Sequence, residues 1–204
     1  MVNSSEFSRR GFSAGLLAAT SALALMPTAS FAQSARQASA LVEDVVNDIN
    51  SIINSGQSES RMLSRFERLF GQYANTTVIA FRCLGADARR ASNSQKRAFV
   101  QAFEGYIARK YGRRFREFIG GRVDVQDARA VKSWIEVRTN AQLQGSAPFR
   151  VDFLVKEAGG RNLFFDMLIE GISLTRVERE EIGAMLDSRG GDLDRLISDL
   201  RTAG

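Results

Sequence analysis

Residues 149–169 read FRVDFLVKEAGGRNLFFDMLI, and this stretch decides the fold. Its first half alternates apolar and polar side chains with a period of two, which is typical of a β-strand with one buried face. Gly159-Gly160 then predicts a hairpin turn, and Leu163 to Ile169 is the returning strand. Strands joined by so short a turn pair antiparallel, so the stretch predicts part of an antiparallel sheet with one buried face.

Two further strands precede this hairpin. Val123 and Val125 belong to the first of them, and residues 131–139 alternate over their whole length. Residues 144–146, Gln-Gly-Ser, predict the turn that leads back to the hairpin. We therefore expect a curved antiparallel sheet of about four strands within residues 122–173.

The rest of the chain has helical periodicity. Apolar residues recur three and four positions apart through residues 33–121, which we expect to be mainly helical, and again through residues 174–204. Cys83 lies in one of these helices, within the apolar run VIAFRCL, and is expected in the core. The chain from residue 33 to residue 204 is long enough for one domain with its own core, so we expect an α+β domain whose sheet packs against a helical subdomain.

Three helix starts carry capping residues. Ser92 with Gln95 has the spacing of a capping box, in which the Ser hydroxyl and the Gln side chain each bind a backbone N–H of the first turn. Thr175 with Glu178 has the same spacing. Asp192 is expected to be the N-cap of the last helix.

Residues 1–32 are typical of an export signal. The apolar run from Ala14 to Met26 is shorter than the ~20 residues that a membrane span needs, and small residues follow it at Ser30 and Ala32. Arg9-Arg10 favours the twin-arginine route, with an ordinary Sec signal as the alternative. We expect the mature chain, residues 33–204, in a periplasm.

The composition excludes several kinds of active site. The chain has 204 residues, with one Cys and no His. Without His there is no Ser-His-Asp or Cys-His nucleophile and no His general base. A single Cys excludes an intramolecular disulfide and a Cys-rich zinc site. We expect no catalytic residues, no metal and no cofactor.

Four carboxylates keep one enzymatic alternative open. Asp152 and Asp166 lie on strands expected to be neighbours, with Glu136 and Glu170 nearby, and paired carboxylates can perform acid–base chemistry without His. The other interpretation is that they occupy the polar face of the sheet and are balanced through cross-strand pairs by Arg150, Lys132 and Arg138. The pattern lacks an activated nucleophile, which favours the cross-strand pairs over a hydrolase.

The run from Asp166 to Leu174, DMLIEGISL, resembles the D-V-x-I-E-G-V-S-L motif of the MlaC-like family of periplasmic phospholipid carriers, associated with maintenance of lipid asymmetry and toluene tolerance. Arg179 stands where that family has the Arg of its N-Y-R segment. Three further segments match the family pattern in order and spacing: Leu84-Gly85 followed by Ser92, Gln95 and Phe99; Val151-Asp152-Phe153; and Gly191 to Leu200.

This resemblance implies a non-catalytic lipid carrier. It would bind phospholipid acyl chains in an apolar pocket between sheet and helices, and shuttle lipid between outer-membrane and inner-membrane transport complexes. The implied partners are an MCE-domain protein of an inner-membrane ABC transporter and an outer-membrane lipoprotein complex, and the chain is expected to be a monomer. Because relatives of this family also accompany hopanoid systems, a hopanoid-associated lipid-binding protein is the alternative. A cavity for two acyl chains would distinguish a carrier from an enzyme or a purely structural interaction module.

The side chains expected to contact lipid are apolar and face a common space, with the long helix that begins after Ser92 covering the sheet. An ordinary core is the alternative, because aromatic stripes at regular spacing are usually core. The expected lipid-contact residues are Phe70, Phe99, Phe103, Ile107, Ile135, Val137, Val151, Phe153, Phe165 and Met167.

The chain is basic, with a formal net charge of +5. A basic chain first suggests nucleic acid, but an exported protein rarely meets any, so anionic headgroups or an acidic partner are the better candidates. Arg109, Arg113 and Arg116 share one helix face and form a candidate partner-docking surface. The alternative is a solvated face whose cations favour a helix C-terminus.

Overall fold

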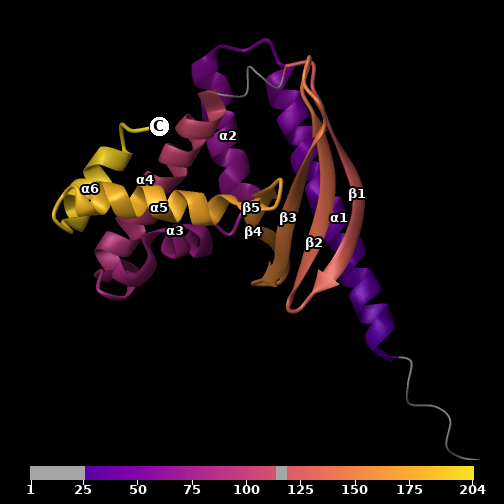
Figure 1. Ribbon diagram of the computed structural model, residues 1–204, viewed down its shortest axis with the longest axis horizontal. Helices are drawn as coiled ribbons and strands as arrows, with labels where there is room; N and C mark the ends of the chain where they lie inside the picture. The colour runs from indigo at the N-terminus through magenta and orange to yellow at the C-terminus, as the bar shows by residue number, and fades with distance from the viewer. Residues whose placement is uncertain (1–25, 114–118) are drawn as a thin grey trace, which may run out of the picture.

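The computed structural model describes residues 26–113 and 119–204, and for residues 26–33 it describes the backbone only. Within these ranges, the chain forms six α-helices, one short 3-10 helix and a five-stranded sheet. Helix α1 lies against one face of the sheet, and the other helices lie to one side of it (Figure 1). In chain order the elements are α1 (Met26–Ile53), α2 (Glu59–Tyr73), α3 (Thr76–Leu84), η1 (Gly85–Arg89), α4 (Asn93–Gly112), β1 (Arg122–Val131), β2 (Trp134–Gln142), β3 (Phe149–Ala158), β4 (Arg161–Ile169), β5 (Ile172–Ser173), α5 (Leu174–Asp187) and α6 (Leu193–Leu200).

The strands form one antiparallel sheet in the order β1-β2-β3-β4-β5, so neighbours in sequence are neighbours in space. The hairpin predicted at Gly159-Gly160 is confirmed, and both glycines take the positive φ that such a turn requires. The sheet has four long strands and a fifth of two residues, close to the expected number. The predicted α+β class is confirmed.

One strand boundary differs from the prediction. The alternation over residues 131–139 predicts a single strand, but the chain reverses at Lys132 and Ser133, and Val131 pairs with Trp134. Lys132 takes a φ of 55°, a conformation that residues other than glycine rarely adopt. Because this turn contains no Gly, Asn or Pro, the period-two pattern runs through it and conceals the break.

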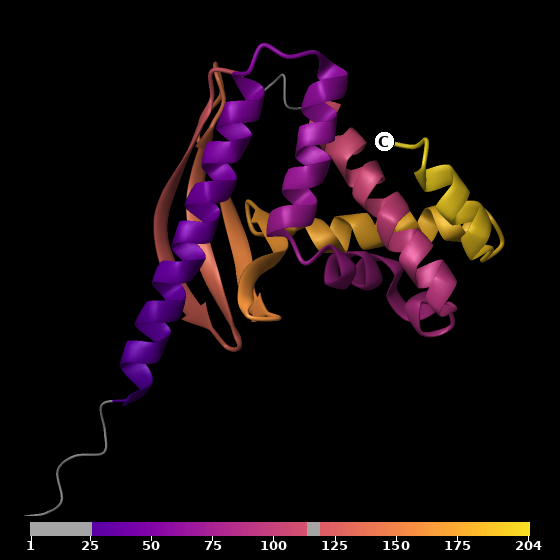
Figure 2. The same ribbon diagram turned by 180° about the vertical axis from the view of Figure 1, so that it is seen from behind.

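Helix α1 covers the inner face of the sheet and runs across it (Figure 2). The sequence predicts this position for α4, which packs instead against α2, α3 and α6. The reason lies in how α4 is buried. It buries small residues, Gly105 and Ala108, as well as Phe99 and Phe103, so it needs neighbouring helices around more than one of its faces.

The caps of α4 and α6 are confirmed. The Ser92 hydroxyl accepts from the backbone N–H of Gln95 at 3.2 Å, and the Gln95 side chain accepts from the backbone N–H of Ser92 at 3.1 Å. Asp192 Oδ1 accepts from the backbone N–H groups of Asp194 and Arg195, each at 3.1 Å. These short-range contacts fix both helix starts.

The capping box predicted for Thr175 with Glu178 is wrong. The N-cap of α5 is Ser173, two residues earlier, whose hydroxyl accepts from the backbone N–H of Arg176 at 3.1 Å. Asp166, within β4, accepts from the Thr175 N–H at 3.0 Å and from the Ser173 hydroxyl at 2.7 Å. Because the helix starts earlier, Glu178 falls on its buried side.

Most of the predicted signal peptide, residues 1–32, lies outside the described residues, as does the whole Arg9-Arg10 pair. Helix α1 begins within that stretch, at Met26. None of the helices in the part of the chain that the structure describes is long and apolar enough to cross a membrane.

Candidate functional site

An apolar layer joins the inner face of the sheet to the helices. Val137, Phe153 and Met167 are direct neighbours across β2, β3 and β4. The ring of Phe164 lies 5.7 Å from that of Phe153 and 6.2 Å from that of Phe70 on α2. The strands and α2 therefore share one continuous apolar contact.

A second aromatic series runs along α4. The ring of Phe103 lies 5.9 Å from that of Phe99 and 6.3 Å from that of Tyr106. Phe99, Phe103 and Ile107 are buried in the same continuous core as the strand residues. The structure thus brings the predicted helix and strand residues into one core, although α1 is the helix that lies over the sheet.

Phe165 does not share the inner face with the other predicted residues. A β-bulge shifts the register between β3 and β4, so that Phe164, rather than Phe165, pairs with Val155 on that face. The Phe165 ring lies instead 6.0 Å from that of Trp134 and 5.3 Å from the Arg82 guanidinium, on the outer side of the sheet.

The apolar layer is closely packed. Val137, Phe99 and Phe103 have no exposed surface, whereas Phe70 and Met167 are half-buried at its margin. Three surface pockets of about 410, 390 and 630 Å³ lie among the described helices and the α5 N-terminus, and none of the predicted lipid-contact residues lines them.

Sequence reasoning missed several residues that build this layer. Val42 and Val45 on α1 and Phe66 on α2 are buried in it, as is Phe164. The helical stripe on α1 is visible in the sequence, but which surface it covers is a long-range contact that spacing does not reveal.

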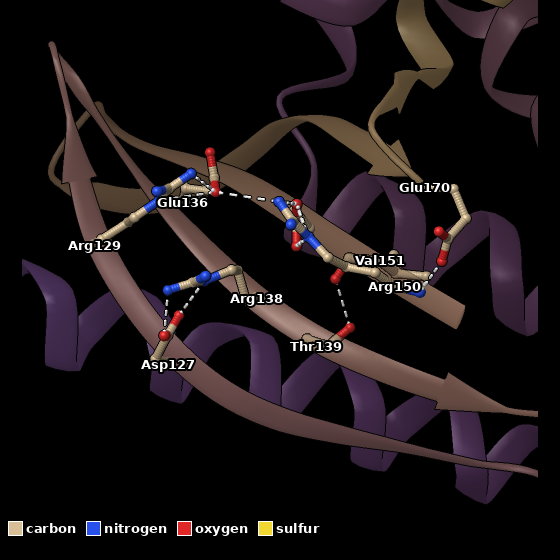
Figure 3. Close-up of polar contacts among 9 residues, drawn as sticks. Asp127, Arg129, Glu136, Arg138, Thr139, Arg150, Val151 and Glu170 are labelled. Carbon is tan, nitrogen blue, oxygen red and sulfur yellow. Dashed lines mark hydrogen bonds and ion pairs between the residues drawn. The ribbon is translucent and has the colours of Figure 1, made fainter. Parts of the chain in front are cut away.

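Arginines hold the carboxylates on the outer face of the sheet (Figure 3). Glu136 and Asp152 are 6% and 0% exposed, so each needs a charged partner. Arg129 donates to Glu136 at 2.7 and 3.0 Å, and Arg150 Nε donates to Asp152 at 2.7 and 2.8 Å. Of the predicted cross-strand partners, Arg150 on β3 lies 3.8 Å from Glu136 on β2, whereas Arg138 pairs with Asp127 on β1 and Lys132 lies in the β1–β2 turn. Arg129, which is opposite Glu136, is not among the predicted partners.

The other two carboxylates also have their own donors. Asp166 binds the start of α5, and Glu170 accepts from the backbone N–H of Arg150. This is the arrangement of structural ion pairs and caps, and it gives no support to the hydrolase alternative. Among residues 34–113 and 119–204, no group of three or more His, Cys, Asp or Glu side chains could hold a metal ion.

A polar cluster, Tyr106, Lys110, Tyr111, Glu178 and Glu181, cross-links α4 to α5. Lys110 donates to Glu178 at 2.7 Å and also to Glu181, Tyr106 donates to Glu181 at 2.6 Å, and Tyr111 donates to Glu178. Burial, and then the bond to Glu181, raises the pKa of Tyr106. Although burial works in the opposite direction, the bonds within the cluster raise the pKa of Lys110 and lower that of Glu181.

These shifts predict how stability depends on pH. Because its pKa is lowered, Glu181 contributes stability above its ordinary value of 4.5 and loses it as the pH falls through the lowered pKa. Because its pKa is raised, Lys110 contributes stability below 10.5 and loses it as the pH rises through the raised pKa. We expect the free energy of unfolding of Lys110→Met to fall furthest below that of wild type at pH values between the lowered pKa of Glu181 and the raised pKa of Lys110. Outside this range the difference should be smallest. Urea unfolding over a pH series measures it.

Of the three arginines predicted to dock a partner, one is already bonded within the protein. Arg109 Nε donates to the Ala203 carbonyl at 2.8 Å and its Nη2 to the Leu200 carbonyl at 2.5 Å, so Arg109 caps the C-terminal end of α6. Arg113 is exposed, and Arg116 lies outside the described residues. Docking through this face therefore remains a prediction for Arg113 and Arg116.

Cys83 is buried, as expected. Burial raises the pKa of its thiol to about 12, so the thiolate is absent at neutral pH. The residue acts as a small apolar side chain of the core.

Comparison with known proteins agrees with this architecture. The phospholipid-binding protein from Ralstonia solanacearum, whose structure was determined in complex with a phospholipid, matches with a TM-score of 0.68 and 19% sequence identity. The match covers 80% of this chain and 98% of that one, and at this identity it shows the shared fold. The sequence model of the MlaC protein family matches residues 43–202. Because that match spans most of the chain, including the whole sheet and all of α2 to α6, the chain belongs to the MlaC protein family.

Proposed function

We propose that this protein is a periplasmic lipid carrier that binds phospholipid acyl chains between its sheet and its helices. The main support for this proposal is that the chain belongs to the MlaC family. The apolar layer of β2, β3, β4, α1 and α2 supplies the surface that acyl chains would need.

The energetics explain why a carrier must enclose the chains. Each methylene moved from water into an apolar environment contributes about 0.8 kcal/mol, so a lipid with about 30 methylenes favours a bilayer over water by on the order of 20 kcal/mol. A protein that carries such a lipid through an aqueous compartment has to offer a comparable apolar interior.

Lipid binding requires the apolar layer to open. Val137 and Phe153 are buried against each other, so an acyl chain can contact them only if α1 or α2 moves away from the sheet. Such a movement exchanges contacts within the protein for contacts with the acyl chain, which keeps the buried apolar area similar in the two states.

Val137→Trp tests this site. We expect the larger side chain to occupy the space that an acyl chain would take, so the variant should retain its fold but lose its co-purified lipid. Overpacking a close-packed interior typically costs about 1–3 kcal/mol, which a domain of this size tolerates. Bound lipid is measured by native mass spectrometry and by solvent extraction.

Val177→Trp is the matched control, because Val177 is 40% exposed on α5 and gains the same volume outside the layer. It should keep the wild-type lipid content. Wild-type protein without any lipid, or equal lipid in Val137→Trp and Val177→Trp, would contradict the proposed site. The extracted lipid also decides between a glycerophospholipid and the hopanoid alternative.

We further propose that residues 1–32 direct export by the twin-arginine route. The carrier would act as a monomer and exchange lipid with an MCE-domain protein of an inner-membrane ABC transporter and with an outer-membrane lipoprotein complex. The exposed Arg113, with Arg116, is the proposed contact with an acidic partner.

A further inference from the structure

A pocket of about 390 Å³ lies between α3, η1 and the start of α5. Four of the side chains that line it are arginines, and none is a carboxylate. The lining residues are Phe81, Arg82, Gly85, Ala86, Arg89, Ser173, Thr175, Arg176 and Arg179. We call this the arginine pocket.

Most of the arginines of this pocket have no carboxylate partner among the described residues. Considering only the described residues, Arg82, Arg89 and Arg179 form no ion pair, and Arg176 has one contact of 3.4 Å, to the exposed Glu180. Arg129, Arg138 and Arg150 of the sheet, by contrast, each pair with a nearby carboxylate. Among the described residues, three of the four arginines of the pocket therefore have no ion-pair partner.

Two of the guanidinium groups are held in place without an acid. The Arg82 guanidinium lies 5.3 Å from the centre of the Phe165 ring, a cation–π contact that leaves its N–H groups free to donate. Arg179 lies against the backbone of Gly85, where a Cβ atom would come within 3.2 Å of its Nη2. Gly85 has a φ of +66°, so glycine serves both the backbone conformation and the close approach.

The start of α5 adds to the positive potential. Ser173 is the N-cap of this 14-residue helix, and both Ser173 and Thr175 line the pocket. A helix N-terminus carries a partial positive charge, which favours an anion nearby. Since the Ser173 hydroxyl and Asp166 already accept from the first N–H groups, the arginines supply the available donors.

From this geometry we propose that the arginine pocket binds a phosphate group. Guanidinium groups bind phosphate through paired N–H donors, and several of them around one pocket match its several acceptor oxygens. The phosphate is either that of an anionic lipid headgroup at a membrane surface or a free phosphate. None of its lining residues is a predicted lipid-contact residue. The one such residue that Arg82 contacts, Phe165, lies on the outer side of the sheet, so the site is separate from the apolar layer.

The test compares the double variant Arg82→Gln with Arg179→Gln against a control pair, Arg61→Gln with Arg68→Gln. The control removes the same charge from exposed positions on α2. The probes are inorganic phosphate, titrated by calorimetry against chloride at equal ionic strength, and phosphatidylcholine vesicles with or without phosphatidylglycerol, assayed by co-sedimentation. Arg89→Gln, at an exposed position without an ion pair, serves as a second variant should the double variant fold poorly.

We expect the double variant to bind at least about a hundredfold more weakly, since each lost charged hydrogen bond costs about tenfold or more, and the control pair to change binding less than about threefold. Loss of phosphate binding identifies free phosphate as a ligand. Loss of association with phosphatidylglycerol vesicles alone identifies the headgroup. If wild type binds neither probe, or if the two double variants bind alike, the proposal is overturned. Co-purified lipid should be unchanged in every variant, so this test is independent of the acyl-chain site.

Discussion

Replacing Lys110 by Met is expected to lower the free energy of unfolding by about 3–5 kcal/mol at neutral pH. Lys110 donates to Glu178, whose side chain is only 2% exposed. Without the ammonium group, this buried carboxylate would lose its cationic partner and keep the Tyr111 hydroxyl as a donor. Desolvation of an unpaired charge is among the largest costs that a single substitution can impose.

A second substitution separates the cost of the unpaired Glu178 charge from the cost of any lost packing around Lys110. Glu178→Leu in the Lys110→Met background removes the unpaired charge, and we expect it to restore most of the lost stability. Arg90→Met is the control, because it breaks an exposed pair with Asp87 and should change stability by less than about 1 kcal/mol. Chemical unfolding of the four proteins provides the measurement. A double variant as unstable as Lys110→Met would show that the loss does not come from the charge.

Phe164→Ala is expected to destabilise the protein by about 3–5 kcal/mol, the usual range for removing a buried phenylalanine. Phe164 is 4% exposed, and its ring contacts those of Phe153 and Phe70. The substitution would leave a cavity where the sheet meets α2, because three elements converge there and cannot all move inward.

Phe165→Ala is the matched comparison. Phe165 is half-buried on the outer side, so its loss should cost about 1–2 kcal/mol, from the aromatic contact with Trp134 and the cation–π contact with Arg82. Thermal and urea unfolding of both variants measure the difference. A larger loss for Phe165→Ala than for Phe164→Ala would place Phe165 on the inner face and exclude the β-bulge.

Phe164 and Phe165 also show where the period-two pattern of a strand fails to predict which face a side chain occupies. Counting back by two from Met167 places Phe165 on the inner face, and this is correct for a regular strand. The bulge inserts one extra residue in β4, which changes the face of everything before it. Since the bulge depends on how β3 and β4 pair, the β4 sequence read by itself gives no sign of it.

Some residues of the two candidate binding sites could be predicted from the sequence and others could not. The apolar strand residues of the candidate site, such as Val137 and Phe153, follow from alternation and are indeed inside. The arginine pocket could not be predicted, because Arg82 and Arg179 lie on separate helices, nearly 100 positions apart in the sequence. Arg109, expected on a docking surface, caps the end of α6 because the C-terminus folds back onto α4.

The sequence alone determined the α+β class, the hairpin at Gly159-Gly160, and the caps at Ser92 and Asp192. Each of these depends on residues a few positions apart, which interact in the same way whatever the rest of the chain does. The tertiary structure decided that α1 covers the sheet and that Glu178 is buried beside Lys110. These contacts join distant segments, and they form only where the whole core satisfies its apolar surfaces and buried charges together.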